Sequence, residues 1–161
     1  MMPDENEMPG SPPTPNAGRA KAVPLPPSLA VWTGYLLGRA SQQCRDYFDA
    51  LVTPLGIRGR HFGVLAVVGE GKPLSQIEIS ERLGIDRNTM VLLLDDLEAG
   101  LFVTRTRDPQ DRRAHLVALT SAGRDVLAQG TRLAQRTNDE VLSPLSPDER
   151  AQLHALLGRL F

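Results

Sequence analysis

Apolar residues recur along the chain with the spacing of amphipathic helices. The first such series advances in steps of three, four and seven, at Leu29, Leu36, Ala40, Cys44, Tyr47 and Leu51. It predicts one long helix with a single buried stripe that ends near Pro54. A second, strongly apolar helix is expected over residues 62–68, because Gly69, Gly71 and Pro73 follow it directly.

Two short helices with clear start signals come next. Ser75 and Glu78 have the spacing of a capping box, in which each side chain bonds the backbone of the other. Gly84 suits the left-handed end of that helix. Asp86 can cap a following helix over residues 87–98. Two helices joined by so short a turn form a helix-turn-helix.

A β-hairpin follows the second short helix. Residues 102–107 are β-branched and alternating, residues 108–111 have the composition of a turn, and residues 114–119 form a second alternating segment. A helix-turn-helix followed by a hairpin is a winged helix. The expected fold is therefore mainly α with a small β-hairpin wing.

Two more helices are expected after the hairpin. One begins at Thr120 or Ser121 and continues to about residue 142, and the last begins at Ser146. The last helix has leucines on one face, at Leu153, Leu156, Leu157 and Leu160. A monomer would leave the apolar faces of the N- and C-terminal helices in water, so dimerisation through these helices is expected.

Composition sets the limits of the folded domain. Of the 13 prolines in the 161 residues, eight precede residue 28, so residues 1–27 are expected to be a disordered tail. The domain is expected at 28–161, with a DNA-binding lobe at 58–120 between dimerisation helices at 28–57 and 121–161.

One cysteine excludes an internal disulfide and a multi-cysteine zinc site. With no secretory signal and no long apolar segment, a cytoplasmic protein without membrane contact is expected.

Positive charge is concentrated in the predicted wing. The whole chain has a formal net charge of −1. Between Leu101 and His115, four arginines outnumber two aspartates; they are Arg105, Arg107, Arg112 and Arg113, against Asp108 and Asp111. A local basic ribbon on a nearly neutral chain is suited to contacts with DNA phosphates.

These motifs resemble the MarR family of transcriptional regulators. The residues that carry the resemblance are 74–76, 83–86, Asp95-Asp96-Leu97-Glu98, 107–114 and Leu119-Thr120-Ser121-Ala122-Gly123. The resemblance implies a winged-helix homodimer that binds palindromic double-stranded DNA and often releases it on meeting a small ligand, with repression as the usual outcome. One departure is Gly100, which stands one place before the family's glycine, so the joint between helix and wing is expected to differ.

The resemblance also implies which residues contact DNA. Arg113 is expected in the minor groove, with Asp111 orienting it. On the second short helix, the residues that can hydrogen-bond to bases are Arg87, Asn88 and Thr89. Val91 and Leu92 can contact thymine methyl groups. In an alternative reading this face is shallow in the groove and the wing supplies the affinity. The full predicted set is Ser75, Gln76, Arg87, Asn88, Thr89, Val91, Leu92, Arg105, Arg107, Asp111, Arg112 and Arg113.

An effector site is a further hypothesis. An arginine beside aromatic rings suits an aromatic carboxylate, and the proposed set is Trp32, Tyr35, Arg39 and His61. Alternatively, the two aromatic residues pack in the dimer, Arg39 lies on the surface and His61 is an ordinary helix residue. Oxidation of Cys44 is a rival switch.

Two other classes of protein are alternatives to the regulator: an interaction protein and an enzyme. The exposed Val91-Leu92 and acidic Asp95-Asp96 pairs are compatible with a dimeric interaction protein that has lost DNA binding. An enzyme is not expected, because the sequence has no recognised catalytic motif, and no cofactor or metal is expected.

Overall fold

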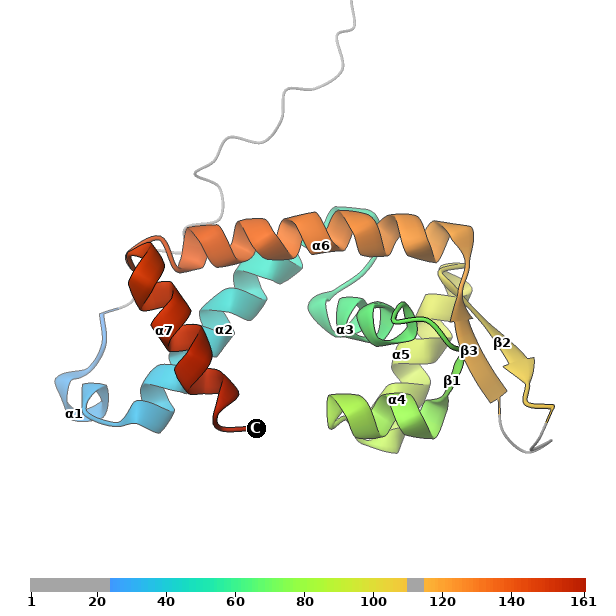
Figure 1. Ribbon diagram of the computed structural model, residues 1–161, viewed down its shortest axis with the longest axis horizontal. Coiled ribbons are helices and arrows are strands. Elements are labelled where there is room, and N and C mark those ends of the chain that lie inside the picture. Colours follow the sequence, from blue (N-terminus) through green and yellow to red (C-terminus); the bar gives the residue numbers. More distant parts are fainter. Residues whose placement is uncertain (1–23, 110–114) are drawn as a thin grey trace, which may run out of the picture.

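The computed structural model describes residues 24–109 and 115–161. Most of the predicted tail lies outside these ranges, as do three predicted wing contacts, Asp111, Arg112 and Arg113. The described elements, shown in Figure 1, are α1 (Pro27–Ala30), α2 (Thr33–Val52), the 3-10 helix η1 (Thr53–Leu55), α3 (Gly59–Val68), β1 (Leu74–Ser75), α4 (Gln76–Leu83), α5 (Arg87–Ala99), β2 (Val103–Arg107), β3 (His115–Leu119), α6 (Ser121–Val141) and α7 (Pro147–Gly158).

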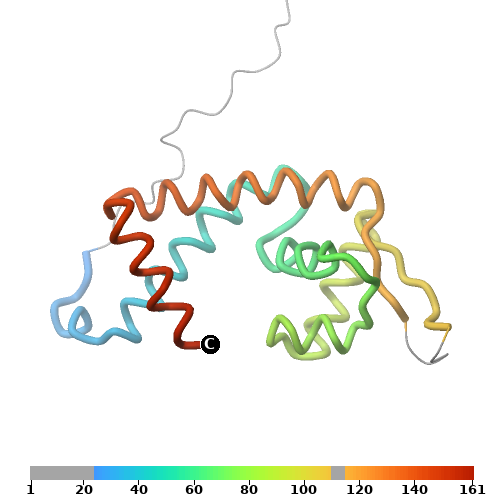
Figure 2. Tube along the Cα trace, in the orientation of Figure 1, coloured from blue at the N-terminus to red at the C-terminus, as the bar shows by residue number. Residues whose placement is uncertain are grey.

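Helix α6 runs along one side of the molecule and connects its two ends (Figure 1). One end consists of α1, α2 and α7, and the other contains α3, α4, α5 and the sheet. The tube in Figure 2 shows the chain passing from the first end to the second and returning through α6. Most of the fully buried large side chains belong to the second end; they are Leu65, Ile79, Met90, Leu94, Leu97, Val64 and Val117. The helix-turn-helix therefore has its own core.

The predicted single first helix is wrong, because α1 and α2 are separate helices. Trp32 has an extended backbone and stands as the N-cap of α2. The run Val31-Trp32-Thr33 has low helix propensity, so the helix is interrupted there. Pro27 stands at the first position of α1, where proline favours the start of a helix. The predicted buried stripe is also only partly covered by this chain, since Leu29 and Leu36 are exposed.

The capping signals of the helix-turn-helix are confirmed. The Ser75 N–H donates to Glu78 Oε2 at 2.7 Å, and the Glu78 N–H donates to Ser75 Oγ at 3.3 Å. Hydrogen bonds from Ser75 lower the pKa of the Glu78 carboxyl. Gly84 has a left-handed backbone, and Asp86 accepts from the Thr89 N–H at 2.9 Å. These local bonds fix where α4 and α5 begin and where α4 ends.

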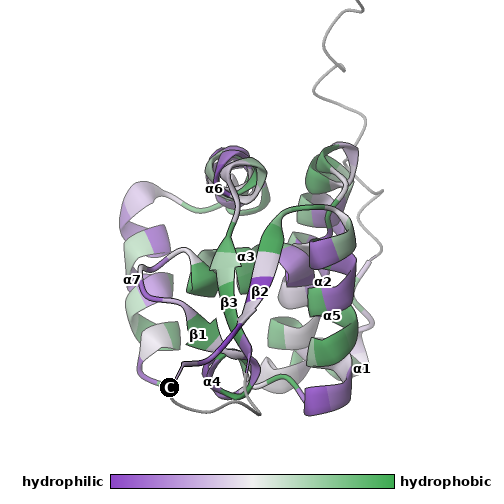
Figure 3. Cartoon of the chain, turned by 90° about the vertical axis from the view of Figure 1, so that its right-hand side faces the viewer, coloured by the Kyte–Doolittle hydropathy of each residue, from purple (hydrophilic) through white to green (hydrophobic). Residues whose placement is uncertain are grey.

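The wing is part of a three-stranded antiparallel sheet in the order β1-β3-β2. Figure 3 shows this sheet facing the viewer, with α6 seen end-on. Strands β2 and β3 pair from Val103 with Leu119 to Arg107 with His115, which confirms the predicted hairpin. Strand β1 was not predicted, because two residues are too few to show an alternating pattern.

The start of α6 packs closely against the end of α5. Thr120 Oγ1 donates to the Leu101 carbonyl at 2.7 Å and accepts from the Gly123 N–H at 3.0 Å. A Cβ atom built on Gly123 would overlap the backbone carbonyl of Phe102. The Leu-Thr-x-x-Gly motif therefore holds α6 against the joint between α5 and β2.

That joint contains an unusual backbone conformation. Among the described residues, Leu101 is the one non-glycine with a positive φ, at 59°. Gly100, by contrast, has an ordinary helical backbone at φ −75°. The glycine thus stands one residue before the position that takes the left-handed conformation, which costs a residue with a Cβ about 1–2 kcal/mol.

We expect Leu101→Gly to stabilise the protein by about 1 kcal/mol, because it relieves this strain and removes a side chain that is 73% exposed. The measurement is thermal unfolding of the variant and wild type. Leu101→Ala is the matched control, since it shortens the side chain but keeps a Cβ at positive φ. An equal gain in Leu101→Ala would show that strain is not the cause.

Within the two described ranges, no single helix is both long enough and apolar enough to cross a membrane. The bent pair formed by Thr33–Leu55 and Gly59–Val68 meets the length and composition criteria only when taken together.

Candidate nucleic-acid interface and effector cavity

Helix α5 has one buried and one exposed face. Its inner face is formed by the predicted core residues Met90, Leu93, Leu94 and Leu97, all of which are buried. On the outer face Asn88 is exposed, Leu92 is 66% exposed and Val91 is 38% exposed. The outer face of the first two turns of α5 is therefore more apolar than a usual DNA-reading helix.

The polar candidates lie around the starts of α4 and α5. Arg87 is exposed and Thr89 is half-buried, both in the first turn of α5. Asp86 accepts from the Thr89 N–H, and this bond lowers the pKa of the Asp86 carboxyl. Ser75 and Gln76, at the start of α4, are both half-buried, and Ser75 Oγ donates to Glu78 Oε2 at 2.7 Å. The Ser75 hydroxyl is thus already engaged in capping.

The structure places Arg105 differently from the predicted phosphate contact. Its guanidinium Nη2 lies 2.5 Å from Asp95 Oδ1, and its Nε lies 3.6 Å from Glu98 Oε2. The side chain is only 21% exposed, on β2 against α5. Two α5 carboxylates therefore already balance its charge and join β2 to α5, and the contact of Arg105 with DNA stays a prediction.

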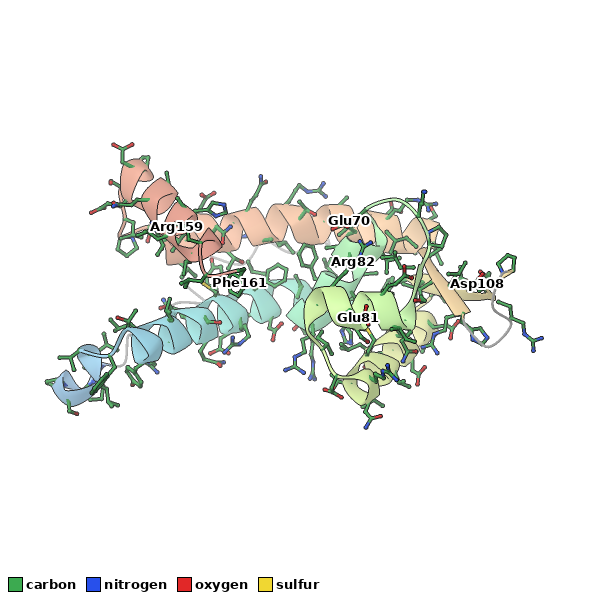
Figure 4. All side chains as sticks on the ribbon, turned by 60° about the horizontal axis from the view of Figure 1, so that its bottom comes forward. Glu70, Glu81, Arg82, Asp108, Arg159 and Phe161 are labelled. Carbon is green, nitrogen blue, oxygen red and sulfur yellow. The ribbon has the colours of Figure 1, made fainter. Side chains whose placement is uncertain are left out.

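The exposed wing charge that the structure describes is that of Arg107. Among residues 101–109 it is the remaining arginine, and it is exposed at the end of β2. Figure 4 shows the neighbouring Asp108 at the far end of the molecule from Arg159 and Phe161. The wing therefore projects away from the N- and C-terminal helices, as a groove-contacting element requires.

A cavity of about 930 Å³ lies where α2, α3, α5 and α6 meet. Its lining includes Cys44, Arg45, Phe48 and Asp49 from α2, Arg58 before α3, Gly59, Arg60, His61 and Phe62 from α3, Leu93 and Asp96 from α5, and Ala134, Thr137 and Asn138 from α6. The rings of Phe48 and Phe62 meet edge to face, with centroids 5.1 Å apart. The walls of the cavity thus come from α5 together with α2, α3 and α6.

His61 connects this cavity to the recognition helix. Its Nδ1 accepts from the Arg58 backbone N–H at 3.1 Å. Its Nε2 lies 3.4 Å from Asp96 Oδ2 on α5. Although Nε2 is buried, it makes no aligned hydrogen bond with any described residue. His61 is therefore a lining residue whose unsatisfied Nε2 is covered in this conformation, with Asp96 beside it.

The predicted effector set is not brought together in this chain. His61 lines the cavity, but Trp32, Tyr35 and Arg39 are absent from its lining. Arg39 precedes the first α2 lining residue, Cys44, by five residues, which is about 7.5 Å along a helix. Trp32 stands outside α2 as its N-cap and is 64% exposed. Cys44 and Phe48 are four residues apart and therefore share one face of α2, a spacing that could have indicated the observed wall.

Cys44 has the environment of a packing residue. It is half-buried on α2, and burial raises the pKa of its thiol while the nearby Arg45 opposes that effect. A raised pKa lowers the thiolate fraction at neutral pH, and the thiolate is the form that peroxides oxidise. The effect of burial exceeds that of Arg45, so this environment disfavours oxidation of Cys44.

This chain is similar to known transcriptional regulators in both sequence and fold. A family model described as the MarR family matches residues 55–114. The transcriptional repressor CouR, in a structure bound to a 23-mer DNA duplex, is 35% identical with a TM-score of 0.77, over 83% of this chain and 95% of that chain. The chain belongs to the MarR family. It is therefore a DNA-binding transcriptional regulator with a winged helix-turn-helix.

Other solved MarR family structures agree with this assignment. PcaV, a transcriptional regulator from Streptomyces coelicolor in complex with its natural ligand, is 30% identical with a TM-score of 0.74, over 82% of this chain and 93% of that chain. A MarR variant from E. coli complexed with operator DNA is 28% identical with a TM-score of 0.74, over 80% and 92%. Within the family frame, α5 is the recognition helix and β2–β3 is the wing.

Proposed function

We propose that this MarR family regulator is a homodimeric repressor that leaves its operator when a small anionic aromatic compound occupies the cavity between α2, α3, α5 and α6. The observation that carries the proposal is the makeup of the cavity walls. Leu93 and Asp96 come from the recognition helix, whereas Cys44 and Phe48 come from α2 and Thr137 from α6. A molecule bound there contacts both parts whose relative placement sets DNA binding.

The lining of the cavity supports an anionic aromatic ligand. Its volume lies in the range of about 300–1,000 Å³ typical of small-molecule sites. Phe48 and Phe62 supply aromatic surface. The cations Arg45, Arg58 and Arg60 outnumber the carboxylates Asp49 and Asp96. Arginine binds carboxylates by paired hydrogen bonds, so an aromatic acid fits this lining better than a cation does. PcaV, with its bound natural ligand, is a relative in which a small molecule occupies the protein.

The proposed dimer uses the end of the molecule opposite the wing. Large apolar side chains are exposed there on α1, α2, α7 and their flanks, at Leu29, Val31, Trp32, Leu36, Leu37, Leu156, Leu160 and Phe161. A second copy would cover this surface, and twofold symmetry would present two recognition helices to a palindromic operator. Trp32 and Tyr35 then belong to dimer packing rather than to the cavity.

We propose that sequence reading is shared between polar and apolar groups of α5. Arg87, Asn88 and Thr89 supply hydrogen bonds, whereas Val91 and Leu92 contact thymine methyl groups. Arg107 contacts phosphate from the wing. The contributions of Asp111, Arg112 and Arg113 stay predictions that lie outside the described residues.

The apolar reading is tested by the variant Val91→Ser, Leu92→Arg on a randomised operator library. We expect the preferred sequence to change at the thymine positions, because each good base contact discriminates by about 1–3 kcal/mol. The measurement is sequencing of the bound DNA for variant and wild type. If both select the same sequence, the exposed apolar pair does not read bases.

The effector proposal is tested by filling the cavity. Ala134 lies on its α6 wall, so Ala134→Trp should occupy the space that an aromatic acid would take. We expect wild type to lose at least about tenfold in operator affinity with such an acid, or about 1.4 kcal/mol of coupling, and Ala134→Trp to lose much less. The measurement is a gel shift on the DNA upstream of the gene, with and without aromatic carboxylates.

Gln129→Trp is the matched control, because Gln129 is exposed on α6 and does not line the cavity. It should respond to the acids as wild type does. Operator binding without acid checks that each variant folds. Equal release of Ala134→Trp and wild type would place the effector elsewhere, and no release by any acid would reject the ligand class.

A further inference from the structure

We propose that the pair His61 and Asp96 is the switch contact of this regulator: an anionic group in the cavity takes the hydrogen-bond donor of His61, repels Asp96 and so displaces the recognition helix. This inference rests on the proposed function, and it names how occupancy of that cavity is passed to DNA binding. It concerns two residues that face each other across the joint between α3 and α5.

His61 is the fixed partner. Its ring stands in the first turn of α3, with Nδ1 accepting from the Arg58 backbone N–H at 3.1 Å. A neutral histidine that accepts at Nδ1 has its proton on Nε2, so Nε2 is a donor. The side chain is 12% exposed, and the buried Nε2 has no aligned hydrogen bond within the described chain. A buried donor without a partner is destabilising, so a well-placed acceptor that bonds to it lowers the free energy of the protein.

Asp96 is the movable partner. Its Oδ2 lies 3.4 Å from His61 Nε2, but its side chain is 70% exposed. A pair with one partner in water contributes little to stability, so Asp96 can leave without stranding a buried charge. The contact is thus held firmly on the α3 side and loosely on the α5 side.

A bound carboxylate would change the balance of this contact. His61 Nε2 is covered in this conformation, so an acid oxygen reaches it by taking the place of the exposed Asp96 carboxylate. There it satisfies the donor, and Arg58 and Arg60 on the same lining favour a negative charge. The same oxygen would stand beside the Asp96 carboxylate, and like charges at such a distance repel each other. The charge of the ligand, rather than its bulk alone, therefore drives α5 away.

Displacement at Asp96 reaches the DNA-reading surface because both are on one helix. Leu93, one turn earlier, also lines the cavity, so the ligand touches two successive turns of α5. Val91 and Leu92 are exposed on the outside of those turns. A helix moves as a unit over so short a distance, and a shift of about 1 Å disturbs base contacts that depend on hydrogen-bond geometry.

The test uses 4-hydroxybenzoate and its uncharged analogue 4-hydroxybenzamide as probes of wild type and Asp96→Asn. Calorimetry measures binding of each probe, and the gel shift measures operator affinity with and without it. For wild type we expect the acid to weaken operator binding at least tenfold and the amide, where it binds, to weaken it less than threefold. Asp96→Asn should bind the acid as tightly as wild type or more tightly, yet lose less than threefold in operator affinity.

Asp95→Asn is the matched control. Asp95 is the neighbouring α5 carboxylate, it faces Arg105, and it does not line the cavity. Its operator affinity can change, but the ratio with and without acid should stay at the wild-type value. Thermal unfolding confirms that each variant is folded.

The outcomes separate the two proposals. Acid binding to Asp96→Asn with full release of the operator would overturn the switch and leave the proposed function standing. Equal release by acid and amide would also overturn it, because charge would then have no part. Failure of wild type to bind 4-hydroxybenzoate or any other aromatic carboxylate in calorimetry would overturn both.

Discussion

Gly123→Ala is expected to destabilise the folded protein by about 3 kcal/mol or more, a large fraction of the about 5–15 kcal/mol by which native domains are stable. The reason is the close approach between the first turn of α6 and the chain that enters β2. A Cβ at position 123 would overlap the Phe102 carbonyl, and the obstacle is backbone rather than the end of a flexible side chain. The whole of α6 would have to move to make room.

The same movement would break the bonds that join α6 to the wing. Thr120 Oγ1 bonds the Leu101 carbonyl, and the Thr120 N–H donates to the Phe102 carbonyl at 3.0 Å. Both bonds require α6 to lie against this joint. The loss of packing and of these bonds therefore occurs together, which places the expected effect above that of ordinary overpacking.

Urea unfolding followed by circular dichroism measures the effect. Gly63→Ala is the control, because Gly63 is also helical and a Cβ there meets only Leu83, at 3.9 Å. That change should be neutral or stabilising by up to about 1 kcal/mol, as expected for glycine replaced by alanine in a helix. Equal urea midpoints for Gly123→Ala and wild type would mean that a Cβ at position 123 does not clash with the Phe102 carbonyl.

Arg105→Ala is expected to weaken operator binding about 30-fold, or about 2 kcal/mol. Arg105 holds Asp95 and Glu98 of the recognition helix, and without it two carboxylates on α5 would face the phosphates uncompensated. The wing would also lose its brace against α5. Arg107→Ala, in contrast, should remove one phosphate contact and reduce the salt dependence of binding by about one unit of slope.

A double-mutant cycle distinguishes the two roles. If Arg105 acts through Asp95, the variant Arg105→Ala, Asp95→Asn should recover a large part of the lost affinity, whereas Asp95→Asn should not rescue Arg107→Ala. Operator affinity over a salt series is the measurement. Absence of rescue in the first pair would mean that Arg105 itself contacts DNA.

Features set by neighbouring residues were predictable from the sequence. The capping box of Ser75 and Glu78, the Asp86 cap and the left-handed Gly84 each depend on residues within one turn, and all three are confirmed. The buried face of α5 followed from its period. The motif of Leu119 to Gly123 also identified the family, although its physical basis became visible only in the contact with Phe102.

Features set by distant residues were not predictable. The ion pairs of Arg105 were not visible in the sequence, because its partners Asp95 and Glu98 are ten and seven residues away on α5. The predicted effector residues are not brought together in this chain for a related reason. Trp32 and Arg39 share a helix pattern with Cys44, but only packing against α3 and α6 decides which turn of α2 borders the cavity.

The route from β3 to α6 has a mechanical consequence. Thr120 alone separates β3 from α6, and β3 is the central strand of the sheet. The 21 residues of α6 form a rod about 31 Å long at about 1.5 Å per residue. Because a single residue joins β3 to α6, the strand follows the helix. A tilt of α6 by about 10° about one of its ends displaces its other end by about 5 Å, given that helical rise. In the proposed dimer, a small reorientation of α6 where the two subunits meet would therefore produce a larger displacement of the wing relative to DNA.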